Sequence, residues 1–99
     1  MFIKTHRSYR LVAAICDSEL IGKKFEEGNK MLDVRESFYK GEEIQDETKA
    51  IEKLIDLAKE DATFNIIGRK SVQCALRAGI IAESGVSSVQ GIPFALGLL

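Results

Sequence analysis

Residues 11–16 read Leu-Val-Ala-Ala-Ile-Cys, six apolar side chains in succession. A strand with one face in water alternates apolar and polar residues, whereas a strand that is apolar on both faces is buried on both sides. We therefore expect residues 10–17 to form a central strand that is covered on both faces by this chain or by an oligomer partner. Residues 2–7 precede it across Ser8-Tyr9 and complete an N-terminal β-hairpin.

The clearest helix is expected over about residues 46–61. Its apolar positions 51, 54, 55, 58 and 62 recur at helical spacing, and Asp46 or Thr48 supplies the N-cap. A second helix is expected over residues 71–78, ended by Gly79, and further strands over residues 30–35, 63–67 and 86–90. Residues 18–28 and 37–46 read as irregular connections, 91–93 as a turn, and 96–99 as an apolar tail.

These elements predict one α+β domain over residues 1–99. The architecture we expect is a two-layer sandwich, in which two helices cover one face of a small, mostly antiparallel sheet. The composition agrees: 99 residues, 45% of them hydrophobic, bury enough surface for a core without disulfides or a structural metal.

Cysteine, histidine and targeting patterns exclude several classes. One His and two Cys are too few for a Cys/His zinc site, and no metal or cofactor is indicated. Cys16 and Cys74 lie in apolar runs, which is typical of buried free thiols in a reducing compartment. The N-terminus lacks the apolar region of a signal peptide, and no stretch approaches the roughly 20 residues of a membrane span. A cytoplasmic location away from membranes follows as the expectation.

The net charge of −1 hides an uneven distribution. Residues 1–30 carry +2, residues 31–63 carry −5, and residues 64–99 carry +2. The acidic part coincides with the first helix and its approach, where a solvated helix face is the ordinary explanation and a basic protein partner the alternative. The average therefore excludes a uniformly basic protein and leaves room for a local cationic patch.

Two clusters suggest anion or nucleic-acid binding. His6, Arg7, Tyr9 and Arg10 crowd the hairpin tip, where cations and an aromatic ring can contact phosphate and stack on a base. The second cluster, from Asn65 to Ser71, resembles a strand–glycine–helix junction at which backbone N–H groups favour an anion. Its ordinary explanation is a solvated helix start with Ser71 as N-cap. It is not a Walker A loop, since the required glycine spacing is missing. The candidate binding residues of this second cluster are Asn65, Gly68, Arg69, Lys70 and Ser71.

Other candidate chemistry is weaker. In the expected hairpin His6 lies opposite residue 11 or 12, too far along the strand from Cys16 for a nucleophilic pair. Asp17 ends a buried strand and is the one acid whose position suits a special environment, and capping of the turn that follows it explains it equally well. Asn65 lies inside an apolar run, so we expect it to hold a loop through hydrogen bonds to backbone, with ligand binding as the minor alternative. Tyr39 suits either the core or base stacking.

Short motifs along the chain resemble a known family. They are Lys4-Thr-His-Arg7, the apolar strand ending Cys16-Asp17, Leu20-Ile-Gly-Lys23, Phe25-Glu-Glu-Gly28, Phe38-Tyr-Lys-Gly41, Ala62-Thr-Phe-Asn-Ile-Ile-Gly68 and Gly91-Ile-Pro-Phe-Ala95. From about residue 2 to residue 95 the chain resembles the small archaeal domain-of-unknown-function family numbered four hundred and twenty-four. The resemblance implies a two-layer α/β sandwich and a cytoplasmic archaeal protein, and it implies no activity. The family is also associated with genes of translation. Where its members tend to place a His after the proline, this chain has Phe94, which argues against an obligatory histidine there.

Three functions follow as hypotheses, and whether the chain is an enzyme stays open. The first is a non-catalytic module that binds RNA or a ribosome-associated protein. It requires that the hairpin tip and the Gly68 junction share one face, and its residues are Arg7, Tyr9, Arg10, Lys23, Lys24, Arg69 and Lys70. The second is a small-molecule or anion-binding protein or enzyme at the Gly68 junction, with Asp17 or His6 as the titratable group. The third is an interaction protein that uses its acidic helix, or its apolar tail for homo-oligomer formation.

Overall fold

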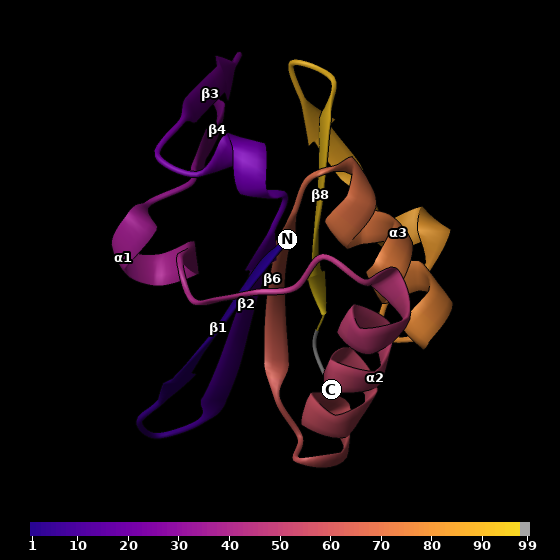
Figure 1. Cartoon of the computed structure of the whole chain (residues 1–99). Coiled ribbons are helices and arrows are strands. Elements are labelled where there is room, and N and C mark those ends of the chain that lie inside the picture. Colours follow the sequence, from indigo (N-terminus) through magenta and orange to yellow (C-terminus); the bar gives the residue numbers. More distant parts are fainter. Residues whose placement is uncertain (98–99) are drawn as a thin grey trace.

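The computed structural model describes residues 1–97, and its main feature is a six-stranded sheet with strand order β5-β1-β2-β6-β8-β7 (Figure 1). Its strands are β1 (Phe2–Arg7), β2 (Leu11–Cys16), β5 (Glu42–Glu43), β6 (Thr63–Ile67), β7 (Ser87–Val89) and β8 (Ile92–Gly97). All neighbouring strands are antiparallel except β2 and β6, which are parallel. The expected N-terminal hairpin and mostly antiparallel sheet are thus confirmed.

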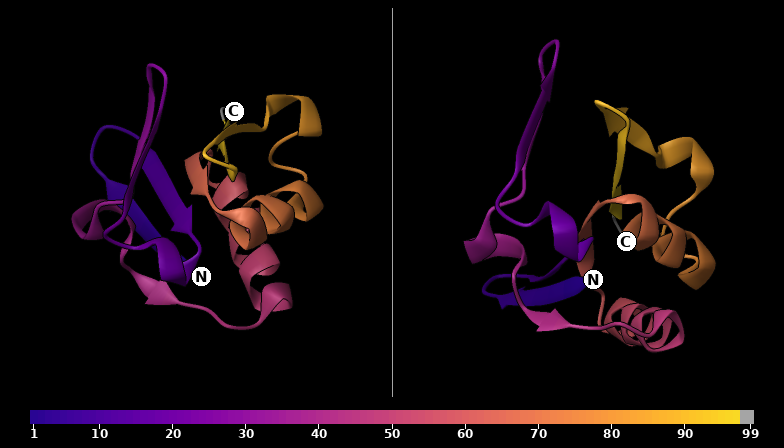
Figure 2. Two further views of the ribbon diagram at one scale, coloured as in Figure 1. Left: turned by 90° about the horizontal axis from the view of Figure 1, so that it is seen from above. Right: turned by 45° about the horizontal axis from the view of Figure 1, so that its top comes forward.

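Strand β2 lies in the interior of the sheet and is covered on both faces by this chain. Ala13 and Ile15 belong to a core cluster formed with α2 (Glu47–Lys59) and α3 (Arg69–Ala78). Ala14 and Cys16 belong to a second cluster on the opposite face. Figure 2 shows α2 and α3 on one side of the sheet and the segment of residues 18–39 on the other. The two helices on one face and the α+β class are therefore as the sequence predicts, and no oligomer partner is needed to cover β2.

The second face is covered by elements that the sequence pattern largely fails to predict. Residues expected to be irregular form strand β3 (Lys24–Glu27), which pairs with β4 (Lys30–Asp33) in a separate two-stranded hairpin. A 3-10 helix, η1 (Ser18–Leu20), precedes it, and the short helix α1 (Glu36–Tyr39) follows it. β3 was missed because only Phe25 among its four side chains is partly buried, so no alternation reveals it.

The helix boundaries follow local capping chemistry. The Asp46 carboxylate accepts hydrogen bonds from the Thr48 and Lys49 amides and begins α2 as expected. Gly79 ends α3 in the left-handed conformation, also as expected. A second 3-10 helix, η2 (Glu83–Gly85), links α3 to β7.

The C-terminal segment differs from the expectation of a turn followed by a tail. The turn lies one residue earlier, at Gln90 and Gly91, both with positive φ, and β8 then runs between β6 and β7. Pro93 is compatible with a strand here because it lies beyond the last β6 pair, Ile67 with Phe94, where no amide donor is needed. Leu96 lies in β8, and the other tail leucines, residues 98 and 99, lie outside the described residues.

Candidate functional site

The carboxylate of Asp17 lies at the N-terminus of α3. Asp17 follows β2 and Gly68 follows β6, and because these strands are parallel, their carboxyl ends meet at one edge of the sheet. Asp17 Oδ1 accepts hydrogen bonds from the Ser71 amide and hydroxyl, both at 2.8 Å, and Oδ2 accepts one from the Lys70 amide at 3.1 Å. Asp17 is 4% exposed and Ser71 fully buried.

This arrangement corrects three expectations about the junction. The helix begins after Gly68, and Ser71 is a buried residue of its first turn rather than the N-cap. Asp17 caps this distant helix and makes no cap bond to η1, the turn that follows it. The amides that were candidates for an external anion bind the protein's own carboxylate, as the positive end of a helix dipole favours. A Cβ at Gly68 would overlap the Asp17 carboxyl group, so the space is already filled.

The hairpin between β1 and β2 ends in a solvent-exposed tip, Ser8 to Arg10. Tyr9 is 101% exposed as a residue, so its ring contacts nothing in the free protein. Arg7 Nη2 lies 3.3 Å from Glu60 Oε1 in an exposed ion pair, while Arg10 has no ion-pair partner within residues 1–97. The tip therefore presents one aromatic ring between two arginines.

His6 does not belong to this tip. It is half-buried, its ring stacks on Phe38 with centroids 4.5 Å apart, and its Nε2 donates a hydrogen bond to the Phe38 carbonyl oxygen at 2.8 Å. His6 pairs with Val12 in the hairpin, as the sequence predicts, and so lies far along the sheet from Cys16. Its observed role is to hold α1 against the sheet.

The basic residues separate into two groups at opposite ends of the sheet. Arg10 precedes β2 and Asp17 follows it, so the six residues of β2 place about 20 Å between the tip and the Gly68 junction. Lys23 precedes β3 and Lys24 is its first residue. The start of β3 lies at the end of the molecule away from the hairpin tip, where α3 also begins (Figure 1). All four cations at that end, the lysines together with Arg69 and Lys70, are exposed. The structure therefore does not bring the predicted RNA-binding residues together into one patch.

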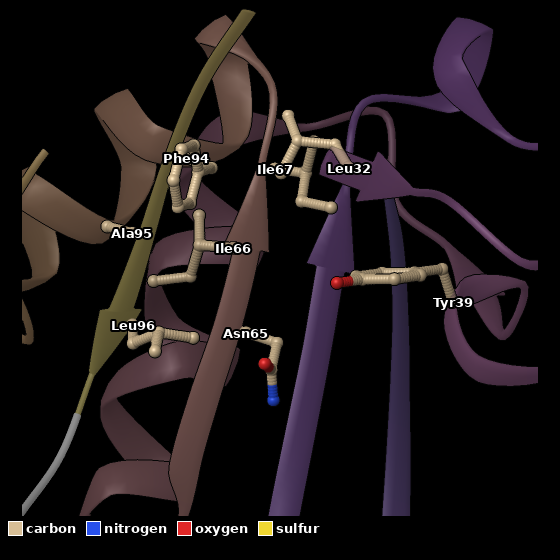
Figure 3. A pocket seen from close by; sticks show the side chains of 8 residues that line it. All are labelled: Leu32, Tyr39, Asn65, Ile66, Ile67, Phe94, Ala95 and Leu96. Carbon is tan, nitrogen blue, oxygen red and sulfur yellow. The ribbon is translucent and has the colours of Figure 1, made fainter. Parts of the chain in front are cut away.

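A pocket of about 170 Å³ lies on the face of the sheet opposite α2 and α3 (Figure 3). One wall comes from β6 and β8, the other from Leu32 of β4 and Tyr39 of α1. Burial, and secondarily the neighbouring Cys16 thiol, raises the pKa of Tyr39 to about 12. Asn65 projects into this space instead of holding a loop, and within residues 1–97 its amide has no hydrogen-bond partner. The lining residues are Leu32, Tyr39, Asn65, Ile66, Ile67, Phe94, Ala95 and Leu96.

The chain is similar to a protein family and to a solved structure. The family described as Protein of unknown function (DUF424) matches residues 5–97, which is nearly the whole chain. The chain belongs to the DUF424 family. The crystal structure of an uncharacterized conserved protein from Methanopyrus kandleri is similar, with a TM-score of 0.85 and 22% identity over 96% of this chain and 87% of that one. That likeness shows the fold. No curated protein matches the chain.

The chemistry available to this DUF424 domain is limited by burial. Both cysteines are free and buried; burial, helped by the adjacent Asp17 carboxylate, raises the pKa of Cys16 to about 12, and burial also raises the pKa of Cys74. Neither thiol is therefore an activated nucleophile at neutral pH. Among residues 1–97, no three His, Cys, Asp or Glu side chains gather in a way that could hold a metal ion. None of the described helices combines the length and the apolarity that crossing a membrane demands.

The DUF424 pocket was only partly visible in the sequence. Asn65 and Tyr39 stand out as polar groups in apolar surroundings, but nothing local places them together. Phe94 and Leu96 were missed because Gly91-Ile-Pro93 reads as a turn, which hides the alternation of β8 behind it.

Proposed function

We propose that this protein is a non-catalytic RNA-binding module whose contact surface is the tip of the β1–β2 hairpin alone. This is a narrower contact than the joint patch the sequence suggested, because the Gly68 junction lies at the other end of the sheet. The observation that carries the proposal is the complete exposure of Tyr9 between Arg7 and Arg10. A ring that packs on nothing in the free protein is available to stack on a base. Base–aromatic stacking is a main source of affinity for single-stranded nucleic acid.

The hairpin is suited to present this ring. Six residue pairs join β1 and β2, and β2 is buried in the sheet on both faces, so the strands that bear the tip are held by the core. Only Ser8, Tyr9 and Arg10 project beyond the paired residues. Less conformational entropy is lost on binding when a contact group is held by such a scaffold.

The charges at the tip predict a weak electrostatic contribution. Arg7 is paired with Glu60, which leaves Arg10 as the cation that is free to meet a phosphate. Each phosphate contact to a single strand changes the logarithm of the binding constant by about −0.7 per unit of log salt. One or two contacts therefore predict a slope between about −0.7 and −1.4, far below that of a protein with a continuous basic groove.

The four cations at the opposite end are outside this contact and serve as controls. Lys23, Lys24, Arg69 and Lys70 lie about a strand length away from the tip. The resemblance to a family associated with translation genes suggests an RNA of a translation assembly as the natural ligand, and this part of the proposal rests on the resemblance alone.

A fluorescence titration tests the proposal. The chain has no tryptophan, so Tyr9→Trp introduces a single reporter at the tip. Single-stranded RNA should quench this tryptophan saturably, because stacked bases quench indole emission. In an anisotropy assay with the unlabelled protein and a labelled oligonucleotide, Tyr9→Ala should weaken binding at least about fivefold, since a lost stack costs about 1–3 kcal/mol.

The matched control is Arg69→Ala/Lys70→Ala, which removes more charge from the other end of the molecule. Its binding should be unchanged while Arg10→Ala weakens binding. If the control variant loses as much affinity as Tyr9→Ala, or if Tyr9→Ala binds like the wild type, the tip is not the RNA contact.

The expectation of self-association through the C-terminal segment stays a prediction. Because Leu96 and Gly97 belong to β8, the truncation that tests it removes residues 98–99 only. A lower apparent mass on size exclusion after that truncation would support the prediction, and an unchanged monomer would refute it.

A further inference from the structure

The pocket on the face of the sheet opposite α2 and α3 has the size of one ring system. Its walls are set by strand register: Asn65 pairs with Leu96 and Ile67 with Phe94, and these four side chains share one face of β6 and β8. Leu32 and Tyr39 close the space from the other side (Figure 3). Its volume of about 170 Å³ is close to that of cavities of about 150 Å³ that accommodate benzene.

The lining indicates an uncharged ligand. None of the eight lining residues in the described part of the chain carries a charge, and six of the eight are aliphatic or phenyl side chains. A charged ligand would lose its hydration here without gaining a counter-charge. The lining thus complements a neutral, flat and mainly apolar group.

Two polar groups give the pocket a direction. Figure 3 shows the Tyr39 hydroxyl at the end of its ring nearest β6, and the Asn65 amide leaving β6 toward β2. A phenol with a pKa of about 12 stays protonated at neutral pH and can donate a hydrogen bond. The Asn65 amide offers both a donor and an acceptor, which matches the edge of a primary amide or a lactam.

The position of Asn65 in the sheet shows that the amide is not needed for packing. Its neighbours across the two flanking strands on this face are Ala14 and Leu96, both apolar. Asn65 is half-buried and its amide has no partner among residues 1–97, so its donor and its acceptor are free to bind a ligand in the pocket.

We propose that this pocket binds a flat, uncharged heteroaromatic ring with an amide-like edge. Asn65 pairs with that edge, Tyr39 donates to an acceptor on the ring, and Phe94 and Leu96 cover its apolar part. The site is separate from the hairpin tip, so it does not depend on RNA binding by Tyr9.

The neighbouring hollow of about 370 Å³ does not have the uncharged lining of the proposed ligand pocket. It is lined by Met31, Asp33, Arg35, Ser37, Phe38 and Tyr39. Its two charged groups, Arg35 Nε and Asp33 Oδ2, are 2.9 Å apart and satisfy each other. Met31 in this hollow is therefore a suitable place for a control substitution.

Nicotinamide and nicotinate form a matched pair of test molecules, since they share a ring and differ in an amide against a carboxylate. We expect nicotinamide, and uracil as a lactam, to shift the NMR signals of the Asn65 side-chain amide and of the Phe94 and Leu96 backbone amides saturably. Nicotinate should bind at least about tenfold more weakly. Asn65→Leu, which keeps the volume, should weaken nicotinamide binding about tenfold, and Met31→Ala should leave it unchanged.

Tyr39→Phe provides a second variant that keeps the ring and removes only the hydroxyl, in case Asn65→Leu disturbs the sheet. Absence of saturable shifts for both nicotinamide and uracil, equal binding of nicotinate, or unchanged nicotinamide binding by both variants would each overturn the proposal.

A uridine hexanucleotide distinguishes the two sources of such a ring. If Asn65→Leu weakens the hexanucleotide and uracil alike, the ring is a base of a nucleic acid. If it weakens uracil or nicotinamide only, the ligand is a free small molecule. Loss of hexanucleotide binding in Tyr9→Ala with retained nicotinamide binding would show that the two sites act separately.

Discussion

Replacement of Asp17 by alanine should be the most damaging side-chain truncation at the edge of the sheet where β2 and β6 end. Three hydrogen bonds to the first turn of α3 end on this carboxylate. Loss of a helix N-cap costs about 1–2 kcal/mol, and the Ser71 hydroxyl, left buried without an acceptor, adds about 1–3 kcal/mol. We expect Asp17→Ala to lower the free energy of unfolding by about 3 kcal/mol, a large part of the roughly 5–15 kcal/mol typical of a domain.

Asp46→Ala is the matched control because Asp46 caps α2 with the same chemistry from an exposed position. Its expected loss is about 1 kcal/mol. Urea unfolding followed by circular dichroism measures both losses. A loss in Asp17→Ala no larger than that in Asp46→Ala would refute the added cost of leaving the Ser71 hydroxyl buried without an acceptor.

A second measurement separates the buried cap from general disruption. In Asp17→Ala the α3 amides and the Ser71 hydroxyl face a space of the size of a carboxyl group. Formate should therefore raise the midpoint of the variant more than that of the wild type, because the helix N-terminus again has an anion to bind. Ser71→Ala added to Asp17→Ala should cost less than its separate effect, since the stranded hydroxyl is gone. A formate effect equal in both proteins would contradict an anion-shaped vacancy.

Three further predictions concern the same core. Gly68→Ala should destabilise the protein by more than about 2 kcal/mol, because residue 68 has a φ of +113° and its Cβ would overlap Asp17; thermal unfolding should show less than additive loss in Gly68→Ala/Asp17→Ala. Cys16 should resist iodoacetamide at pH 8 in the folded protein and react in urea, since a pKa of about 12 leaves roughly one thiol in ten thousand ionised; mass spectrometry of native and unfolded samples would expose rapid native labelling if this is wrong. The free energy of unfolding should fall as the pH rises from about 9 to 12, because the unfolded state releases the Cys16 and Tyr39 protons first. Tyr39→Phe should remove part of that decline above about pH 10, and an unchanged pH dependence in urea unfolding would count against the burial of this hydroxyl.

Much of the secondary structure can be predicted from residues close together in the sequence. The hairpin, α2 and the capped end of α3 follow from apolar periodicity and from Asp46 and Gly79, which act within a few residues of themselves. The β3 strand and β8 could not be found in the same way. Strand β3 has too few buried side chains to show an alternation of apolar and polar residues. Strand β8 contains the end of a Gly-Ile-Pro segment that is normally a turn.

The candidate sites depended more on tertiary contacts. The separation of Arg7, Tyr9 and Arg10 from Arg69 and Lys70 is set by which ends of β2 and β6 lie together, and single segments contain no sign of it. His6 read as a tip residue because its neighbours in sequence are exposed, whereas its ring turns toward Phe38 on the other face of the strand.

The sequence by itself determined the α+β class, the central apolar strand, the amphipathic helix and the family, since each depends on the order of neighbouring residues. Only the tertiary structure decided that Asp17 serves a helix 53 residues away and that Asn65 and Tyr39 face one pocket. The physical reason is the parallel pairing of β2 with β6. This pairing brings the Asp17 carboxylate, Gly68 and the start of α3 to one edge of the sheet. It also leaves the Asn65 amide on the face of the sheet that α1 covers only in part.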